Sequence, residues 1–284
     1  MQIIHEIETL RALIRKERGA GPVVLVPTMG ALHAGHGALV GKGRERAGKN
    51  GMVVVSVFVN PTQFGPDEDF EAYPRTLEAD AQLSAEFGGD VIFAPAAGEI
   101  YQSDHSTGVI ETRLSKGLCG RSRPGHFEGV CQVVLKLLLI VQPDQAVFGK
   151  KDFQQLAVIR RMVRDLNVPV GIVGFETVRE PDGLAMSSRN RYLSEEERAV
   201  APGIQKALQA GRAASLQDPS LSPEAVRTLI LRELEALEGG QVDYLELVDA
   251  ETLEPIEDFS RPVVAATAVF FGRARLIDNV DWAV

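Results

Sequence analysis

Short, continuously apolar runs alternate with segments of helical periodicity through the first two thirds of the chain. Five runs predict strands, at 23–26, 52–59, 90–94, 145–149 and 170–178. Because these runs lack polar alternation, we expect them in a parallel sheet that is covered on both faces. The intervening segments, such as 152–166, carry apolar residues at helical spacing. This alternation predicts an α/β fold with a doubly wound, Rossmann-like parallel sheet.

The pattern changes in the last third of the chain. Ser194 and Glu197 form a capping-box pattern at the start of a helical stretch that runs to about residue 215. A second helix is predicted from the cap at Ser222. The segments 242–250 and 262–280 then resemble the strands of a meander. These elements predict a smaller α+β domain.

A length of 284 residues accommodates this two-domain division. We expect a ligand-binding domain at 1–177 and a smaller domain at 178–284 that closes over the site. The net charge of -9 argues against a nucleic-acid binder that relies on bulk attraction to phosphate. Two cysteines are too few for a disulfide framework, and the amphipathic N-terminus, which carries acidic residues, resembles no targeting signal. A cytoplasmic protein that binds neither nucleic acid nor membrane is therefore expected.

Polar clusters follow the predicted strands. They comprise Pro27–Gly30 with His33 and His36, then Asn60 and Gln63, then Gly149, Lys150, Lys151, Asp152 and Gln155, and finally Met186, Ser187, Ser188 and Arg189. In an open parallel sheet, ligands bind outside the carboxyl ends of the strands, where the strand order reverses. With the order 3-2-1-4-5, the loops after the first and fourth strands would be neighbours. The histidines and the lysine pair would then share one crevice.

The histidine loop has the chemistry of an anion site. Gly30 and Gly35 permit close backbone approach, and a helix beginning near His36 would direct unpaired N–H groups at the anion. His33 and His36, three residues apart, would project to the same side and donate to phosphate oxygens. The alternatives are a structural role for both histidines, or a zinc site, although no third ligand is evident nearby.

The lysine cluster also has a structural interpretation. Lys150 and Lys151 could form a solvated turn, and Asp152 with Gln155 fits an N-cap and its partner.

Two further segments also allow both a structural and a functional interpretation. Gln63 could simply fill a loop, and Ser188 could be a cap, whereas Arg189 suits bidentate phosphate contact.

Taken together, several segments resemble the pantoate–β-alanine ligase family of the nucleotidyltransferase superfamily. They are "PTMGALHAGH", "NPTQFGPDEDFEAYPRTLEAD", "GRSRPGHFEGV", "FGKKDFQQL" and "MSSRN". The H-x-G-H pattern alone marks the wider superfamily, whereas the other segments are more specific to this family. One departure is Gly37, where the family more often has leucine. This glycine weakens helix propensity by about 1 kcal/mol relative to alanine.

The resemblance implies ATP-dependent joining of pantoate to β-alanine through a pantoyl adenylate, giving pantothenate, a coenzyme A precursor, with AMP and pyrophosphate. It implies His36 as proton donor, with His33 and Lys151 as further catalytic residues. It also implies ATP contacts from Met29, Gly30, Ala31, Leu32, His33, Ala34, Gly35, His36, Gly149, Lys150, Lys151, Asp152, Val178, Met186, Ser187, Ser188 and Arg189.

The same resemblance implies that Gln63 and Gln155 bind pantoate and that Asn60 and Gln63 border β-alanine. Mg²⁺ would be held mainly by the ATP phosphates, with help from Asp152. The segment 64–73 is expected to act as a gate, and the chain is expected to form a homodimer.

Two other functions are compatible with parts of the pattern. The first is a tRNA synthetase fragment or another nucleotidyltransferase, although the acidic balance disfavours it. The second is a nucleotide-binding regulatory protein without turnover. Pantoate-dependent exchange of pyrophosphate separates both from a ligase.

Overall fold

The computed structural model describes residues 1–65 and 70–283, and the chain divides into two compact units. The first unit contains residues 1–113, 123–150 and 155–176. The second contains 114–122, 151–154 and the chain from Thr177 onward. Two short segments thus group with the second unit although they precede residue 177.

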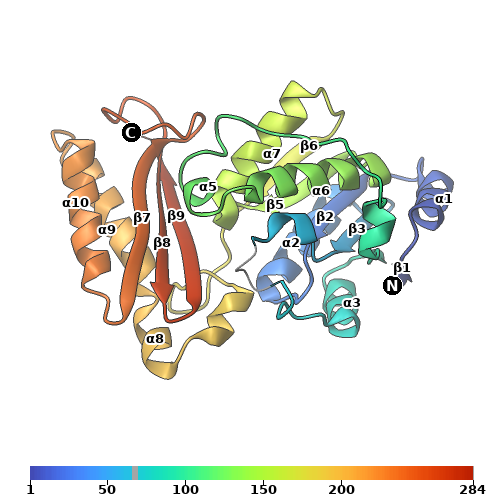
Figure 1. Ribbon diagram of the computed structural model, residues 1–284, viewed down its shortest axis with the longest axis horizontal. Coiled ribbons are helices and arrows are strands. Elements are labelled where there is room, and N and C mark those ends of the chain that lie inside the picture. Colours follow the sequence, from blue (N-terminus) through green and yellow to red (C-terminus); the bar gives the residue numbers. More distant parts are fainter. Residues whose placement is uncertain (66–69, 284) are drawn as a thin grey trace. The chain divides into compact units, whose positions relative to one another are not determined.

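A six-stranded parallel sheet forms the centre of the first unit (Figure 1). Its order is β1-β4-β3-β2-β5-β6, with β1 (Gln2–Ile4), β2 (Val23–Thr28), β3 (Met52–Val57), β4 (Val91–Phe93), β5 (Gln145–Gly149) and β6 (Gly171–Phe175). The five predicted strands therefore occur in the predicted order. Strand β1 was not predicted and extends the sheet beyond β4.

Helices and short 3-10 turns connect these strands. They are α1 (Ile7–Glu17), α2 (Ala34–Ala47), η1 (Pro61–Gln63), α3 (Leu77–Glu86), α4 (Ala97–Ile100), α6 (His126–Val141), η2 (Lys150–Asp152) and α7 (Phe153–Asp165). Val24 and Val26 of β2 pack with Val40 of α2. Leu25, which is fully buried, therefore faces the other side of the sheet because side chains alternate along a strand. The sheet is covered on both faces, as its continuous hydrophobicity predicted.

The second unit is an antiparallel meander with helices. Strands β7 (Gly240–Asp249), β8 (Val263–Phe271) and β9 (Ala274–Trp282) pair in the order β7-β8-β9. Helices α9 (Gly203–Gln217) and α10 (Pro223–Glu235) supply core residues that pack with this sheet, including Leu208 and Ile230. The predicted α+β composition of this part of the chain is confirmed.

The predicted helix at 194–215 is divided. Ser194 and Glu197 do form a capping box at the start of α8 (Glu195–Val200), but this helix ends after one and a half turns. Pro202 immediately precedes α9. Proline lacks the N–H that a continuous helix would need at this position. The prediction of a single helix was wrong for this reason.

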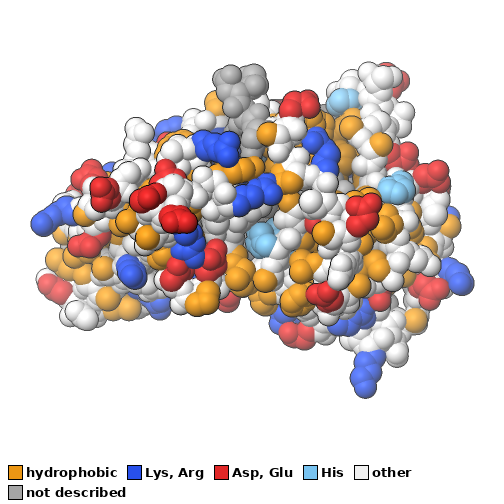
Figure 2. Space-filling view, turned by 90° about the horizontal axis from the view of Figure 1, so that it is seen from below, with side chains coloured by type: hydrophobic (Ala, Val, Ile, Leu, Met, Phe, Trp, Pro, Cys, Tyr) orange, Lys and Arg blue, Asp and Glu red, His pale blue; other side chains and the backbone are white. Residues whose placement is uncertain are grey.

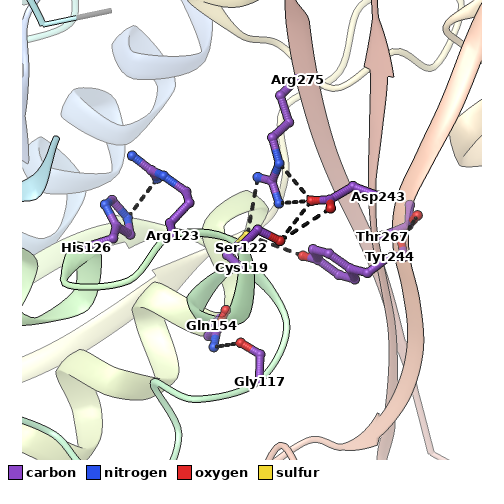
Figure 3. A network of polar contacts seen from close by, with 10 residues as sticks. All are labelled: Gly117, Cys119, Ser122, Arg123, His126, Gln154, Asp243, Tyr244, Thr267 and Arg275. Carbon is purple, nitrogen blue, oxygen red and sulfur yellow. Dashed lines mark hydrogen bonds and ion pairs between the residues drawn. The ribbon is translucent and has the colours of Figure 1, made fainter. Parts of the chain in front are cut away.

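A short helix, α5 (Cys119–Ser122), is held to the meander by polar contacts (Figure 3). Ser122 Oγ donates to Asp243 at 3.1 Å, and Arg275 Nη2 donates to the same carboxylate at 2.6 Å. Cys119 Sγ lies 3.3 Å from the Tyr244 hydroxyl. Burial raises the pKa of Tyr244, so its phenol stays protonated at neutral pH. These contacts fix the segment 114–122 within the second unit.

The charged side chains are interspersed with apolar and neutral ones over the face drawn in Figure 2. None of the helices in the described part of the chain has the length and apolar character that crossing a membrane requires.

Candidate active site

The loops that follow β2 and β5 lie at the reversal of strand order. Val24 of β2 pairs with Val53 of β3 on one side and with Gln145 of β5 on the other. A Cβ on Gly149, at the end of β5, would lie 4.0 Å from Leu39 of α2. The loop after β2 and the start of η2 are therefore neighbours in the first unit, as the predicted strand order requires.

His33 and His36 cap the helix that follows β2. His33 is the N-cap of α2, which begins at Ala34, two residues before the predicted start. Gly35 N donates to His33 Nδ1 at 3.2 Å, and His33 N donates to His36 Nδ1 at 3.3 Å. Since each Nδ1 accepts a hydrogen bond, the neutral rings carry their proton on Nε2. The ring centroids lie 4.1 Å apart.

The backbone N–H groups of this loop are directed mainly at protein acceptors. Gly30 N donates to Thr28 Oγ1, and Ala31 N and Leu32 N donate to Asp80. The N–H groups of His36 and Gly37 donate to the carbonyl of His33. The expectation of unpaired N–H groups facing an anion is wrong for these residues, because side chains and the helix itself already accept their hydrogen bonds. A phosphate contact from this loop would therefore have to involve the imidazole rings rather than these N–H groups.

Asn60 and Gln63 form a buried amide pair after β3. Asn60 Nδ2 donates to Gln63 Oε1 and to Gly129 O, at 3.1 Å each. Asn60 Oδ1 accepts from the Tyr101 hydroxyl at 2.8 Å. With 1% of its surface exposed, Asn60 has its amide donors and acceptor engaged within the protein. Its predicted contact with β-alanine stays a prediction, whereas its support of Gln63 is direct.

Gln63 is held in one orientation by these contacts. Its Oε1 accepts from Asn60, and its Nε2 lies 3.0 Å from Met29 Sδ, a weak acceptor. Tyr101 is a donor in this group because burial raises its pKa, although the hydrogen bond with Thr62 lowers it. The Gln63 amide nitrogen is therefore aimed toward the Met29 side of the loop after β2.

The start of α6 supports the same turn from another element. His126 Nδ1 lies 2.8 Å from Gln63 O, and Arg123 Nη1 lies 3.0 Å from His126 Nε2 (Figure 3). A Cβ on Gly129 would approach Thr62 O to 2.3 Å, so α6 and η1 can pack this closely only with glycine there. Arg123, His126 and Gly129 belong to the segment "GRSRPGHFEGV", which the family resemblance includes, but the sequence predicted no role for them.

A second group of predicted residues comes together in the second unit. Met186 N donates to Val178 O at 2.9 Å, which places these two residues side by side. Lys151 and Ser187 line one small cavity with Asp278. Asn279 Nδ2 of β9 holds the carbonyl of Lys151 at 2.9 Å.

Ser187, rather than Ser188, is the capping serine of the "MSSRN" segment. Its Oγ accepts from Arg189 N at 3.3 Å at the start of η3 (Ser188–Tyr192). The sequence analysis gave Ser188 as the alternative cap, but the cap lies one residue earlier. Ser188 occupies the first position of the turn.

The lysine cluster forms the 3-10 turn η2. Lys150 Nζ pairs with the exposed carboxylate of Glu176 at 2.5 Å. Asp152 lies at the end of η2, directly before α7, and Gln155 lies on the first turn of that helix. No group of three or more His, Cys, Asp or Glu side chains in residues 1–65 and 70–283 is arranged to hold a metal ion.

A cavity of about 320 Å³ lies at the carboxyl edge of β3 and β4 in the first unit. Met29, Gly30, Phe58, Thr76 and Asp80 are among its lining residues. The predicted gate at 64–73 borders it only through Phe70, and residues 66–69 of that segment lie outside the described residues.

Phe87 explains the departure at Gly37. A Cβ on Gly37 would lie 2.6 Å from Phe87 Cε2, so the ring that follows α3 occupies the space that a larger side chain would need. A larger side chain at position 37 would therefore require this ring to move.

These features define a class of protein: a Rossmann-like α/β enzyme with an H-x-G-H loop at the ligand edge of its parallel sheet. The comparisons with known proteins identify the family. The family described as pantoate-beta-alanine ligase matches residues 2–281. Relatives include the pantothenate synthetases of Nitratidesulfovibrio vulgaris, 52% identical over 99% of this chain and 98% of that protein, and of Geobacter sulfurreducens, 50% identical over 98% of each.

Solved structures agree with this result. The pantothenate synthetase of Thermus thermophilus superposes with a TM-score of 0.92 at 46% identity, covering 99% of both chains. The Francisella tularensis ligase, whose structure holds beta-gamma ATP and beta-alanine, gives 0.79 at 32% identity over 99% of this chain and 97% of its own. The chain therefore belongs to the pantoate–β-alanine ligase family.

Proposed function

We propose that the protein condenses pantoate with β-alanine to give pantothenate, and that ATP is cleaved to AMP and pyrophosphate. The observation that carries this proposal is the family match over residues 2–281. ATP and β-alanine as ligands are supported by the complex of the Francisella tularensis relative. The product would be a precursor of coenzyme A.

The reaction would proceed in two steps. In the first, a pantoate carboxylate oxygen attacks the α-phosphorus of ATP, a pantoyl adenylate forms, and pyrophosphate leaves. This step needs alignment and charge neutralisation rather than a protein nucleophile. In the second step, the neutral amine of β-alanine attacks the acyl carbon, and AMP leaves.

His33 and His36 would act as donors to the phosphates. Their Nδ1 atoms accept from backbone N–H groups, so Nε2 is the ring nitrogen that would donate to a phosphate. We propose His36 as the principal donor to the developing charge and His33 as a second contact. Such preorganised donors are the largest electrostatic contribution that a site of this kind can make.

The remaining phosphate contacts would come from the lysine cluster and from residues after β6. We propose Lys151 as the catalytic cation, with ATP contacts also from Met29, Gly30, Ala31, Leu32, Ala34, Gly35, Gly149, Lys150, Asp152, Val178, Met186, Ser187, Ser188 and Arg189. The carboxylate of Asp152 has the oxygen donors that Mg²⁺ prefers. When bound through ATP, this ion would neutralise charge on the phosphates.

Pantoate would be held by two amides. The Gln63 Nε2 group is oriented by Asn60, and Gln155 lies on the first turn of α7. Amides both donate and accept, which suits a substrate with two hydroxyls. We propose that Gln63, supported by Asn60, also borders β-alanine. The family resemblance further supports a cytoplasmic homodimer.

Isotope exchange tests the first step. The purified protein is incubated with ATP, Mg²⁺ and labelled pyrophosphate, with and without pantoate and in the absence of β-alanine. We expect label to enter ATP only when pantoate is present. Pantothenate formation without any such exchange would contradict the adenylate mechanism, and the absence of both reactions would contradict the proposed function.

A further inference from the structure

Asp80 is a buried carboxylate beside the histidine loop to which the reaction assigns no role. It lies on the first turn of α3 with 1% of its surface exposed. Its Oδ1 accepts from Leu32 N at 2.8 Å and from Thr76 Oγ1 at 3.1 Å. Its Oδ2 accepts from Ala31 N at 3.1 Å. Three donors thus converge on one buried side chain, two of them from the loop.

The loop adopts a backbone conformation that needs such support. Gly30 and Ala31 have φ values of +82° and +50°, and the left-handed region is unfavourable for alanine. The turn directs the successive N–H groups of Ala31 and Leu32 toward one point, as in the concavities that backbone N–H groups form for anions. Here the concavity is occupied by the Asp80 carboxylate. A Cβ on Gly30 would approach Asp80 Oδ2 to 3.0 Å, so the two parts fit closely.

The Asp80 carboxylate is linked to the imidazoles through the backbone of Leu32 and His33. Leu32, whose N–H it binds, directly precedes His33, the N-cap of α2. The Nδ1 atoms of His33 and His36 in turn accept from the backbone of the same turn. The path of residues 30–33 therefore positions the backbone groups that both Nδ1 atoms contact.

We propose that Asp80 is the positioning residue of the H-x-G-H loop. It binds the N–H groups of Ala31 and Leu32 and thereby orients the imidazoles of His33 and His36. Because a negative charge would repel a triphosphate, a carboxylate at this place serves the loop rather than the nucleotide. The consequence for catalysis rests on the proposed function of that loop in binding ATP.

Asp80→Asn tests the proposal because it keeps the size of the side chain but turns an NH₂ group toward donors. We expect kcat for pantoate-dependent pyrophosphate exchange to fall at least about tenfold, since small misplacements of catalytic groups have effects of this order or larger. The KM for pantoate should stay within about twofold, because Gln63 and Gln155 are not held by Asp80. A purely structural role would not separate these two constants.

Asp90→Asn is the matched control. Asp90 also accepts from a backbone N–H, that of Val53 at 2.7 Å, but at the opposite edge of the same sheet. This variant should keep the wild-type kcat. Gly30→Ala is a second perturbation of the same loop, since a Cβ there would lie 2.9 Å from Val57 Cγ1 and 3.0 Å from Asp80 Oδ2 and would leave the charge in place. It should also lower kcat by about tenfold or more.

Long-range ¹H–¹⁵N spectra of the histidine rings provide a readout that is independent of activity. In the wild-type protein and in Asp90→Asn, His33 and His36 should show the Nε2–H tautomer, whereas in Asp80→Asn or Gly30→Ala this signature should be lost. Unchanged ring spectra and kcat in these two variants would overturn the positioning role while leaving the proposed function intact. A wild-type protein that neither exchanges pyrophosphate nor forms pantothenate would instead overturn the proposed function, and the ring spectra would still decide the role of Asp80.

Discussion

The two edges of the parallel sheet use carboxylates in different ways. At the amino edge, Asp90 accepts from Val53 N and pairs with Arg44, and Asp144 accepts from Val23 N at 2.7 Å. Both acids bind backbone N–H groups near the start of strands. At the carboxyl edge, Asp80 accepts from two residues of a loop that contains left-handed backbone.

The carboxylates at the two edges should affect different properties of the protein: its stability at the amino edge and its reaction rate at the carboxyl edge. A carboxylate that caps the start of a strand satisfies a backbone donor that would otherwise need water. A carboxylate that holds an irregular loop maintains a conformation that the chain would not adopt unaided. Changes at the amino edge should therefore alter the free energy of unfolding, whereas changes at the carboxyl edge should alter rates.

The largest effect is expected from the groups that would touch the phosphates. His36→Ala and Lys151→Ala should each lower the rate of pantoate-dependent pyrophosphate exchange at least about a hundredfold, because preorganised electrostatic contacts are lost. Lys42→Ala is the control, since this lysine lies further along α2 and pairs with the exposed Glu45. Single-turnover rates near wild type for both site variants would remove these two roles.

The adjacent residues Gln154 and Gln155 test the proposed pantoate contact at the carboxyl edge. Gln155→Ala should raise the KM for pantoate about tenfold or more and leave the KM for ATP within about twofold, because an amide that binds substrate hydroxyls is lost. Gln154→Ala should instead reduce stability, since Gln154 Nε2 donates to the carbonyls of Leu114 and Gly117. Steady-state kinetics with each substrate varied will check this. Equal losses for pantoate and ATP in Gln155→Ala would indicate a general structural defect.

The amino edge should respond in stability alone. Asp90→Asn should lower the free energy of unfolding by about 1 kcal/mol, because its ion pair with Arg44 is lost and its hydrogen bond to Val53 N is weakened. Urea denaturation measures this change. Asp165→Asn, in an exposed pair with Arg164, should change stability by less than about 0.5 kcal/mol. A tenfold loss of kcat in Asp90→Asn would break the distinction between the two edges.

Cys131 on α6, which lies at neither edge of the sheet, should make the free energy of unfolding depend on pH. Burial raises the pKa of its thiol from an ordinary value of about 9 to about 11, although a backbone hydrogen bond from Glu111 lowers it. Between these values the unfolded thiol ionises while the folded one keeps its proton. The unfolded state then binds fewer protons, so stability falls as pH rises, by about 1.4 kcal/mol at pH 10. Cys131→Ala should remove this part of the slope of unfolding free energy against pH, and an identical slope in both proteins would contradict the burial effect.

Much of the fold could be predicted from local pattern, because each strand of the sheet interior is a continuous apolar run. Strand β1 was missed because only one of its three residues is buried, so it lacks the continuous apolar run of the interior strands. The break before α9 depends on the single residue Pro202. The supports of the site were missed for a different reason. Asp80 meets Ala31 across 49 residues, and Tyr101 meets Asn60 across 41. No local periodicity reports such contacts, although Asp80 lies inside a segment that the family resemblance included.

The shared space of Gly37 and Phe87 bears on how the chain can have changed over time. One side chain at each of these positions competes for the same volume beside α2. A descendant that gained a bulky residue at position 37 would first need a smaller or redirected one at 87. Relatives with a bulky residue at the former position are therefore expected to carry a smaller or differently oriented residue at the latter.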